Sequence, residues 1–77
     1  MLISPGLEGI VLSLTPVSIH GDRYVDIVIV DASRPDDHDA RLSARLGSEA
    51  IEGELSPGDR IAVEGFLRTV TGIRKIG

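Results

Sequence analysis

The 77-residue sequence predicts one all-β domain spanning residues 1–77, and three observations support this prediction. First, the apolar residues, 42% of the chain, are dominated by Ile, Val and Leu, which suit pleated strands better than helices. Second, apolar and polar residues alternate over several short segments, as in strands with one buried face. Third, Gly and Pro residues typical of turns separate these segments. Because the chain has no cysteine, a domain this small depends on its apolar core for stability.

The start of the chain predicts two strands joined as a hairpin. Residues 9–19 alternate between apolar and polar positions, and residues 23–32 follow as a more apolar strand interrupted by Asp26. Between them, residues 20–22 include a glycine, which permits the positive φ of a tight turn. Pro16 lies inside the first strand and lacks an amide proton, so we expect a sheet edge or a β-bulge at that point.

The third predicted strand covers residues 40–46 and follows an exposed polar loop at 33–39. Apolar and polar side chains alternate strictly along this strand, so its two faces are easily assigned. We expect Leu42, Ala44 and Leu46 to face the core, and Arg41, Ser43 and Arg45 to face solvent.

A short helix is predicted directly after the third strand. Ser48 suits the N-cap position, and acidic residues follow it near the positive end of the helix dipole. Ile51 and Leu55 are one helical turn apart and would share a buried face. Gly53 limits this helix to one or two turns.

Two further strands complete the predicted fold. Residues 56–59, Ser-Pro-Gly-Asp, predict a type II turn with proline in the second position and glycine at positive φ. The fourth strand covers residues 60–70, and Gly65 marks a bend or bulge within it. A turn at 71–72 then leads into the closing strand at 73–76. The order is therefore three strands, a short helix and two strands.

This order and four of the segments resemble the oligonucleotide/oligosaccharide-binding (OB) domains of the replication protein A type. The segments are residues 25–31 (VDIVIVD), 40–46 (ARLSARL), 49–51 (EAI) and 55–65 (LSPGDRIAVEG). The resemblance implies a five-stranded Greek-key barrel with a short helix between strands 3 and 4. It also implies binding of single-stranded DNA or RNA in a groove formed by strands 2 and 3 with the loops between strands 1 and 2 and strands 4 and 5.

Three candidate binding residues lie on strands 2 and 3. Tyr24 would stack against a base, and Arg41 and Arg45 would hold phosphates on the exposed face of strand 3. Each has a structural alternative. Tyr24 would pack across the strands, and the arginines would pair with Asp26 or Glu64.

Three further candidates lie near the C-terminal end of the chain. Arg68, Arg74 and Lys75 flank the predicted loop between strands 4 and 5, where they could contact phosphates. The alternative for Arg74 and Lys75 is a solvated chain end.

The net charge of −4 runs against nucleic-acid binding, which depends on neutralising phosphates. Only two residues of the chain, Tyr24 and Phe66, are aromatic and could stack on bases. A second hypothesis is therefore an OB-type interaction or assembly module within a nucleoprotein complex, with a protein partner or a second copy of the chain. Val28 and Val30 on the outward face of strand 2 would contribute to such an interface.

Other functions are not expected from the sequence. The loop at 36–39, Asp-Asp-His-Asp, and His20 have metal-binding residue types without metal-site spacing, so we expect solvated side chains and no metal or other cofactor. No nucleophile elbow, phosphate-binding glycine loop or zinc-protease helix occurs, so we expect no enzyme. No apolar segment is long enough to span a bilayer and the start does not resemble a signal peptide, so we expect a cytoplasmic protein without membrane association.

Overall fold

A computed structural model describes residues 2–77 and confirms an all-β domain. Six strands form one sheet, where five were predicted, and two short 3₁₀ turns interrupt them. The elements are β1 (Glu8–Ile19), β2 (Asp22–Asp31), η1 (His38–Ala40), β3 (Arg41–Gly47), η2 (Ser48–Ala50), β4 (Ile51–Glu52), β5 (Arg60–Phe66) and β6 (Thr69–Lys75).

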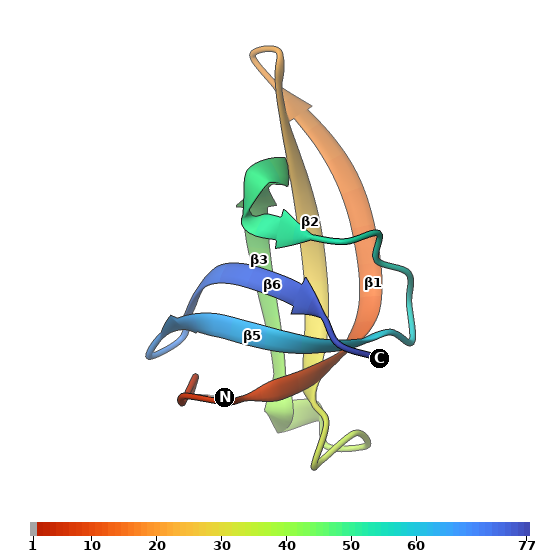
Figure 1. Ribbon diagram of the computed structural model, residues 1–77, viewed down its shortest axis with the longest axis vertical. Coiled ribbons are helices and arrows are strands. Elements are labelled where there is room, and N and C mark those ends of the chain that lie inside the picture. The colour runs from red at the N-terminus through yellow and green to blue at the C-terminus, as the bar shows by residue number, and fades with distance from the viewer. Residues whose placement is uncertain (1) are drawn as a thin grey trace.

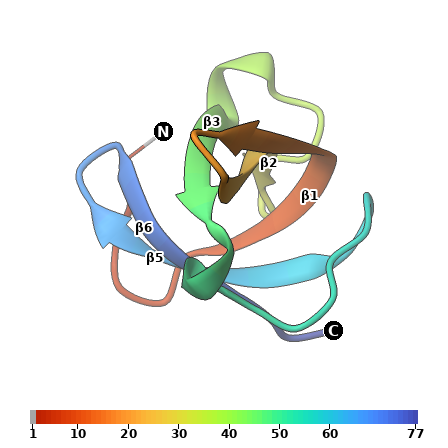
Figure 2. The same cartoon turned by 90° about the horizontal axis from the view of Figure 1, so that it is seen from above.

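The strands are ordered β3-β2-β1-β5-β6-β4, and β4 pairs in parallel with β6 while the other pairs are antiparallel. The sheet is therefore not the closed five-stranded barrel that the sequence predicts, because its edge strands β3 and β4 do not pair with each other. They are consecutive in the chain, and η2 joins them. Figure 2 shows that the sheet curls around a central axis, which brings its two edges to the same side.

The long hairpin of β1 and β2 is as predicted. His20 and Gly21 form its two-residue turn with φ angles of 51° and 83°, the positive values that suit the twist of a hairpin. A β-bulge lies between Val11 and Ser13, and β1 pairs with β5 only over Glu8 to Ile10. Pro16 therefore lies on a free strand edge, and the hairpin tip extends beyond the rest of the sheet (Figure 1).

The prediction of a helix after the third strand is wrong. Ser48–Ala50 form a single 3₁₀ turn whose N-cap is Gly47, without a side-chain cap. Ile51 then enters β4 and pairs with Ile73 of β6. The reason is that burial of Ile51 does not require a helix, because a two-residue strand on the edge of the sheet also packs this side chain against the core.

The turn between the last two strands is also displaced from its predicted position. Residues 71–72 lie inside β6, and the chain reverses instead at Leu67 and Arg68, between β5 and β6. Leu67 adopts a φ of 56°, which leucine rarely does, so the sequence carries no signal for this turn. Two other predictions are confirmed. The ladder shifts register between Glu64 and Gly65, and Gly58 has a φ of 94° in the turn at 56–59.

The inner face of the curled sheet carries the core. Leu42 and Leu46 are buried there, as the alternation of the third strand predicts. Among residues 2–77, no polar or charged side chain is buried. The core cluster consists of Val11, Ile27, Ile29, Leu42, Leu46, Ile61, Val63, Val70 and Ile73.

Candidate nucleic-acid interface

The outer face of β2 and β3 carries three of the predicted binding residues. Because side chains alternate along a strand, Arg41, Ser43 and Arg45 point away from the core and are exposed, as predicted. The register places Tyr24 opposite Gly47 and Asp26 opposite Arg45 on the same face. This outer face therefore brings Tyr24 and Arg45 into one neighbourhood, with Arg41 further along β3.

Arg45 forms an ion pair with Asp26 across the strands. Its Nε donates to Asp26 Oδ1 at 2.7 Å and its Nη2 donates to Oδ2 at 3.0 Å. The two side chains stay half-exposed, at 50% and 41%, so the pair contributes little to folding. The cross-strand pairing of Arg45 with Asp26, which the sequence left as an alternative, is thus present, and any ligand has to compete with a carboxylate for this arginine.

The pair shifts the titration of both groups. The hydrogen bonds and the positive charge of Arg45 lower the pKa of Asp26, and the same contact raises the pKa of Arg45. Asp26 therefore remains ionised at neutral pH. The stability that the ionised Asp26 carboxylate contributes is fully present above the ordinary aspartate pKa of about 3.9. This stability is lost as the pH falls through the lower pKa that Asp26 has in the folded state.

Arg41 lies at the start of β3 and takes part in no ion pair among residues 2–77. Arg45 lies four positions further along the same face, a distance of about 13 Å at ~3.3 Å per residue. Such a spacing suits two phosphates along an extended strand rather than a single one. Arg41 is therefore the arginine of this face that is free to meet a ligand.

Tyr24 is half-buried near the end of the hairpin, where it lies opposite both Val17 of β1 and Gly47 of β3. It lines a polar hollow of about 510 Å³ next to the hairpin turn. Asp22, Arg23 and Glu49 also line this hollow. The ring is thus accessible in part, with charges of both signs beside it.

Arg68, Arg74 and Lys75 do not flank one loop, which corrects the prediction. Arg68 lies in the turn between β5 and β6, whereas Arg74 and Lys75 are at the far end of β6, about 20 Å away at ~3.3 Å per residue. Lys75 Nζ lies 3.6 Å from Asp59 Oδ2, and Arg74 lies opposite Glu52 of β4. The six predicted residues therefore occupy three places on the surface, and only Tyr24, Arg41 and Arg45 share a face.

The β5–β6 turn carries an exposed aromatic residue that the sequence prediction did not include in the site. Phe66 is 73% exposed and its neighbour Leu67 is 58% exposed, directly before Arg68. A backbone hydrogen bond from Ile3 to the Leu67 carbonyl ties the N-terminal segment to this turn. The sequence predicts Phe66 inside a continuous strand over 60–70, whereas the structure places it at the end of β5, next to the turn, where it is exposed.

Val30 does not contribute to an outward patch, contrary to prediction. It is only 1% exposed, although it points away from the core cluster, whereas Val28 remains half-buried on the outer face.

In the predicted polar loop, Asp37 caps η1 by accepting a hydrogen bond from the Asp39 amide at 2.9 Å. Within the described part of the chain, no three His, Cys, Asp or Glu side chains gather as a metal site would require.

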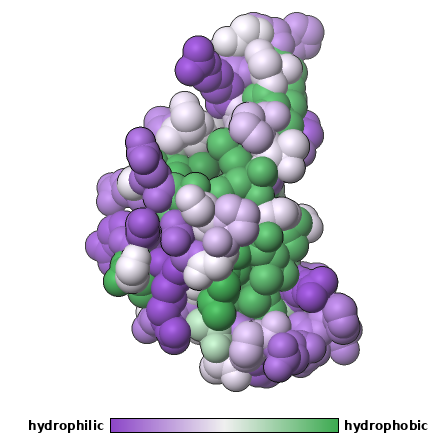
Figure 3. Space-filling view, turned by 90° about the vertical axis from the view of Figure 1, so that its right-hand side faces the viewer, coloured by the Kyte–Doolittle hydropathy of each residue, from purple (hydrophilic) through white to green (hydrophobic). Residues whose placement is uncertain are grey.

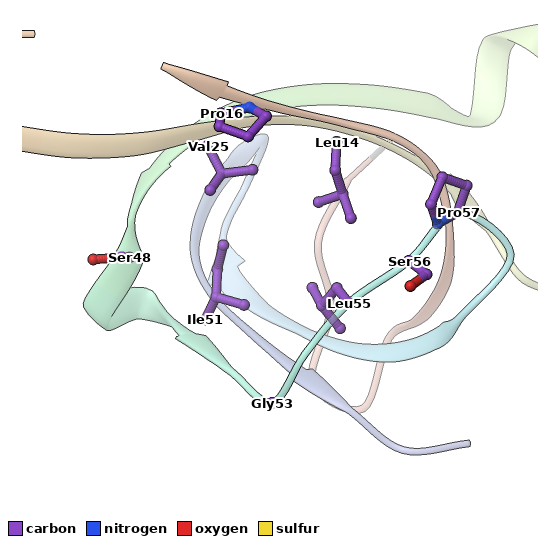
Figure 4. Close-up of a pocket in the computed structure, with 9 residues that line it drawn as sticks. All are labelled: Leu14, Pro16, Val25, Ser48, Ile51, Gly53, Leu55, Ser56 and Pro57. Carbon is purple, nitrogen blue, oxygen red and sulfur yellow. The ribbon is translucent and has the colours of Figure 1, made fainter. Parts of the chain in front are cut away.

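A second hollow, which we call the hairpin pocket, lies on the inner side of the β1–β2 hairpin. It has a volume of about 500 Å³ and is lined mainly by Leu14, Pro16 and Val25 of the hairpin with Ile51 and Leu55 of the opposite segment. Figure 4 shows these apolar side chains on both sides of the hollow. None of its nine lining residues is charged.

Comparisons of this chain with protein-family models, with curated proteins and with solved structures found no match. Over residues 2–77, no helix has both the length and the apolarity needed to cross a bilayer.

Proposed function

We propose that this chain is an OB-type domain with an open, curled sheet and that it binds single-stranded nucleic acid on the outer face of β2 and β3. The observation that carries the proposal is the exposed row of Arg41, Ser43 and Arg45 beside Tyr24. Strand connectivity supports it, because OB domains bind oligonucleotides on the face of strands 2 and 3 and at the loop between the last two strands. Here β1, β2 and β3 form a three-stranded meander, and β5 pairs with β1. β4 continues β3 after η2 and runs parallel to β6.

Each part of the interface has a chemical role in this proposal. Arg41 and Arg45 hold two phosphates that are not adjacent in the strand, and Phe66 at the β5–β6 turn offers a ring on which a base stacks. Such stacking contributes about 1–3 kcal/mol per base in proteins that bind single strands. Arg68, two residues after Phe66, supplies a further positive charge at the same turn.

The first prediction concerns the two arginines. We expect the double variant Arg41→Ala/Arg45→Ala to bind a fluorescein-labelled oligo-dT or oligo-U roughly tenfold more weakly at low salt, because two phosphate contacts are lost. The slope of log K against log salt should decrease in magnitude by about 0.7 for each lost contact. Fluorescence anisotropy measures both quantities.

The matched control is Arg34→Ala/Arg60→Ala, which removes the same charge from exposed arginines elsewhere on the surface. If this control loses as much affinity as the Arg41/Arg45 variant, the binding depends on net charge alone and the proposed face is wrong. If the unmodified domain does not bind either oligonucleotide at low salt, the function itself is wrong.

The second prediction concerns Asp26. Because its carboxylate occupies the Nε/Nη2 edge of the Arg45 guanidinium and neutralises its charge, Asp26→Asn should release that edge for phosphate and tighten oligonucleotide binding by about two- to threefold. Glu8→Gln is the control, since it releases Arg60 from a similar exposed pair at 2.9 Å and changes the net charge equally. Equal effects of the two variants would show that Arg45 has no special role.

A second candidate function, the interaction or assembly module, is favoured by the hairpin pocket. An open apolar hollow without any charged lining residue suits an apolar group of a partner rather than a phosphate chain. This candidate uses a different surface from the arginine face, so both functions are compatible with one domain.

A further inference from the structure

The polar hollow beside Tyr24, which we call the tyrosine hollow, lies at the hairpin end of the molecule. Figure 3 shows apolar surface over the middle of one face and hydrophilic surface at both ends, of which the upper one is the hairpin tip. Within residues 2–77, no aliphatic side chain lines the tyrosine hollow. Its lining residues are Gly21, Asp22, Arg23, Tyr24, Gly47, Ser48 and Glu49. Its volume of about 510 Å³ lies within the roughly 300–1,000 Å³ of small-molecule sites, so a nucleobase has room to enter.

Gly47 lets the carboxylate of Glu49 lie on the outer face, opposite Tyr24. Gly47 follows the buried Leu46 in β3, so a side chain at this position would point to the outer face. A Cβ at Gly47 would contact both oxygens of the Glu49 carboxylate, which therefore fills the space that such a side chain would take. Because Tyr24 and Gly47 are paired in the register, the carboxylate and the aromatic ring are neighbours on one face.

The Glu49 carboxylate has no competing partner within residues 2–77. It is exposed and forms neither an ion pair nor a side-chain hydrogen bond there. Both of its oxygens are therefore available to accept hydrogen bonds. Asp22 and Glu49 outnumber Arg23 in the lining, so the hollow repels a phosphate and favours a neutral group that donates hydrogen bonds.

Guanine is the nucleobase that meets these requirements. The bases of a single strand stack on aromatic rings and present their Watson–Crick edges to the protein. Guanine offers N1–H and N2–H₂ side by side on that edge, and a carboxylate accepts both with its two oxygens. Adenine, cytosine and thymine carry an acceptor next to their donor on the same edge, and a carboxylate repels that acceptor.

The arginine row places a phosphate close to the tyrosine hollow. Arg45 lies two positions before Gly47 on the outer face, about 7 Å away at ~3.3 Å per residue. The paired Asp26 is the main cause of the raised pKa of Arg45, and the charge of Tyr24 is a further cause, so the phenol lies near this guanidinium. The separation is short enough for Arg45 and the hollow to hold the phosphate and the base of one nucleotide.

We propose that the tyrosine hollow is a guanine subsite, in which the Glu49 carboxylate accepts hydrogen bonds from N1–H and N2–H₂ of a base that lies against Tyr24. This inference rests on the proposed binding of single strands at the outer face of β2 and β3 and adds a base preference to it. Arg41 and Arg45 supply affinity for the phosphates, which every sequence shares, whereas Glu49 distinguishes one base from the others.

The test compares three fluorescein-labelled oligonucleotides of equal length in anisotropy titrations of the complete domain at low salt. The first is oligo-dT, the second carries a single dG at its centre, and the third carries deoxyinosine there, which keeps N1–H and lacks the 2-amino group. We expect the dG strand to bind about tenfold more tightly than oligo-dT, as a bidentate base contact allows. The deoxyinosine strand should lose most of this gain.

Three variants locate the preference. Glu49→Gln replaces one acceptor with a donor and should bring the affinities for the dG strand and oligo-dT close to equality. Gly47→Ala retains the carboxylate but displaces it, and should reduce the preference at least threefold. Glu54→Gln is the matched control, because it removes the same charge from an exposed position outside the hollow and should leave the preference unchanged.

The inference is overturned if the dG strand binds no more tightly than oligo-dT, or if the deoxyinosine strand binds as tightly as the dG strand. It is also overturned if Glu54→Gln reduces the preference as much as Glu49→Gln. In each of these cases the proposed function stands, provided that oligo-dT binds and that Arg41→Ala/Arg45→Ala weakens its binding. If none of the three strands binds, the proposed function is wrong and the guanine subsite is wrong with it.

Discussion

Ile29→Ala is expected to lower the free energy of unfolding by about 2–5 kcal/mol, the cost of removing most of a fully buried side chain and leaving a cavity. Ile29 is 0% exposed and lies in β2, opposite Val11 of β1 and Leu42 of β3. All three belong to the same core cluster, so the cavity would lie on the inner face of β1, β2 and β3. Urea unfolding followed by circular dichroism measures the loss.

This effect is large relative to the total stability of the domain. At about 0.05–0.15 kcal/mol per residue, a chain of 77 residues has only about 4–12 kcal/mol in total. No disulfide compensates, because the chain has no cysteine. Ile76→Ala, at a position that is 44% exposed near the C-terminus, is the matched control and should cost well under 1 kcal/mol. Equal losses in the two variants would contradict the assigned core.

Gly65→Ala is expected to destabilise the domain by about 3 kcal/mol, although alanine is usually tolerated better than glycine in a strand. A Cβ at this position would collide with the carbonyl oxygen of Thr69 and would lie 2.8 Å from Cδ1 of Ile3. Thr69 belongs to β6, the partner strand, so relief requires a shift of the β5–β6 ladder next to its bulge. Thermal unfolding of the purified variant measures the effect.

Gly47→Ala provides the comparison. The three atoms nearest to a Cβ at Gly47 all belong to the carboxylate of Glu49, and this flexible, exposed side chain can turn away. We therefore expect Gly47→Ala to change the midpoint of unfolding by only a small amount. A larger loss for Gly47→Ala than for Gly65→Ala would show that the close approach of the two strands at Gly65 is misplaced.

The first half of the fold could be predicted because the local pattern and the tertiary structure agree there. Leu42 and Leu46 alternate with Arg41 and Arg45, and this pattern allows only one face of β3 to be buried. The turn at Gly21 carries its own signal, since glycine adopts positive φ without steric cost.

The second half was harder to predict because the decisive features are not local. The reversal at Leu67 depends on a positive φ in a leucine, and Ile3, distant in sequence, binds the backbone of that turn. The Thr-Gly pair at 71–72 has the composition of a turn, yet Gly72 is buried inside β6, close to the backbone of Ala50. Because the turn was predicted at 71–72, Arg74 and Arg68 were both expected beside it. For the same reason, Phe66 was expected inside a strand and not at an exposed turn.

The prediction of a short helix is wrong for a related reason. The spacing of Ile51 and Leu55 satisfies a helical face, but both side chains also reach the core from an edge strand and an irregular segment. The choice depends on whether β6 is available to pair with Ile51, which only the whole fold determines. The hairpin pocket is a direct consequence of this choice, so the sequence alone could not predict it.

The central claim, that single-stranded nucleic acid binds on the outer face of β2 and β3, is tested most directly by an NMR titration of the ¹⁵N-labelled domain with oligo-dT. We expect the amide signals of Tyr24, Arg41, Arg45 and Phe66 to shift together and to saturate with one affinity. The claim is contradicted if these signals do not move at low salt, or if the shifts are confined to the residues of the hairpin pocket.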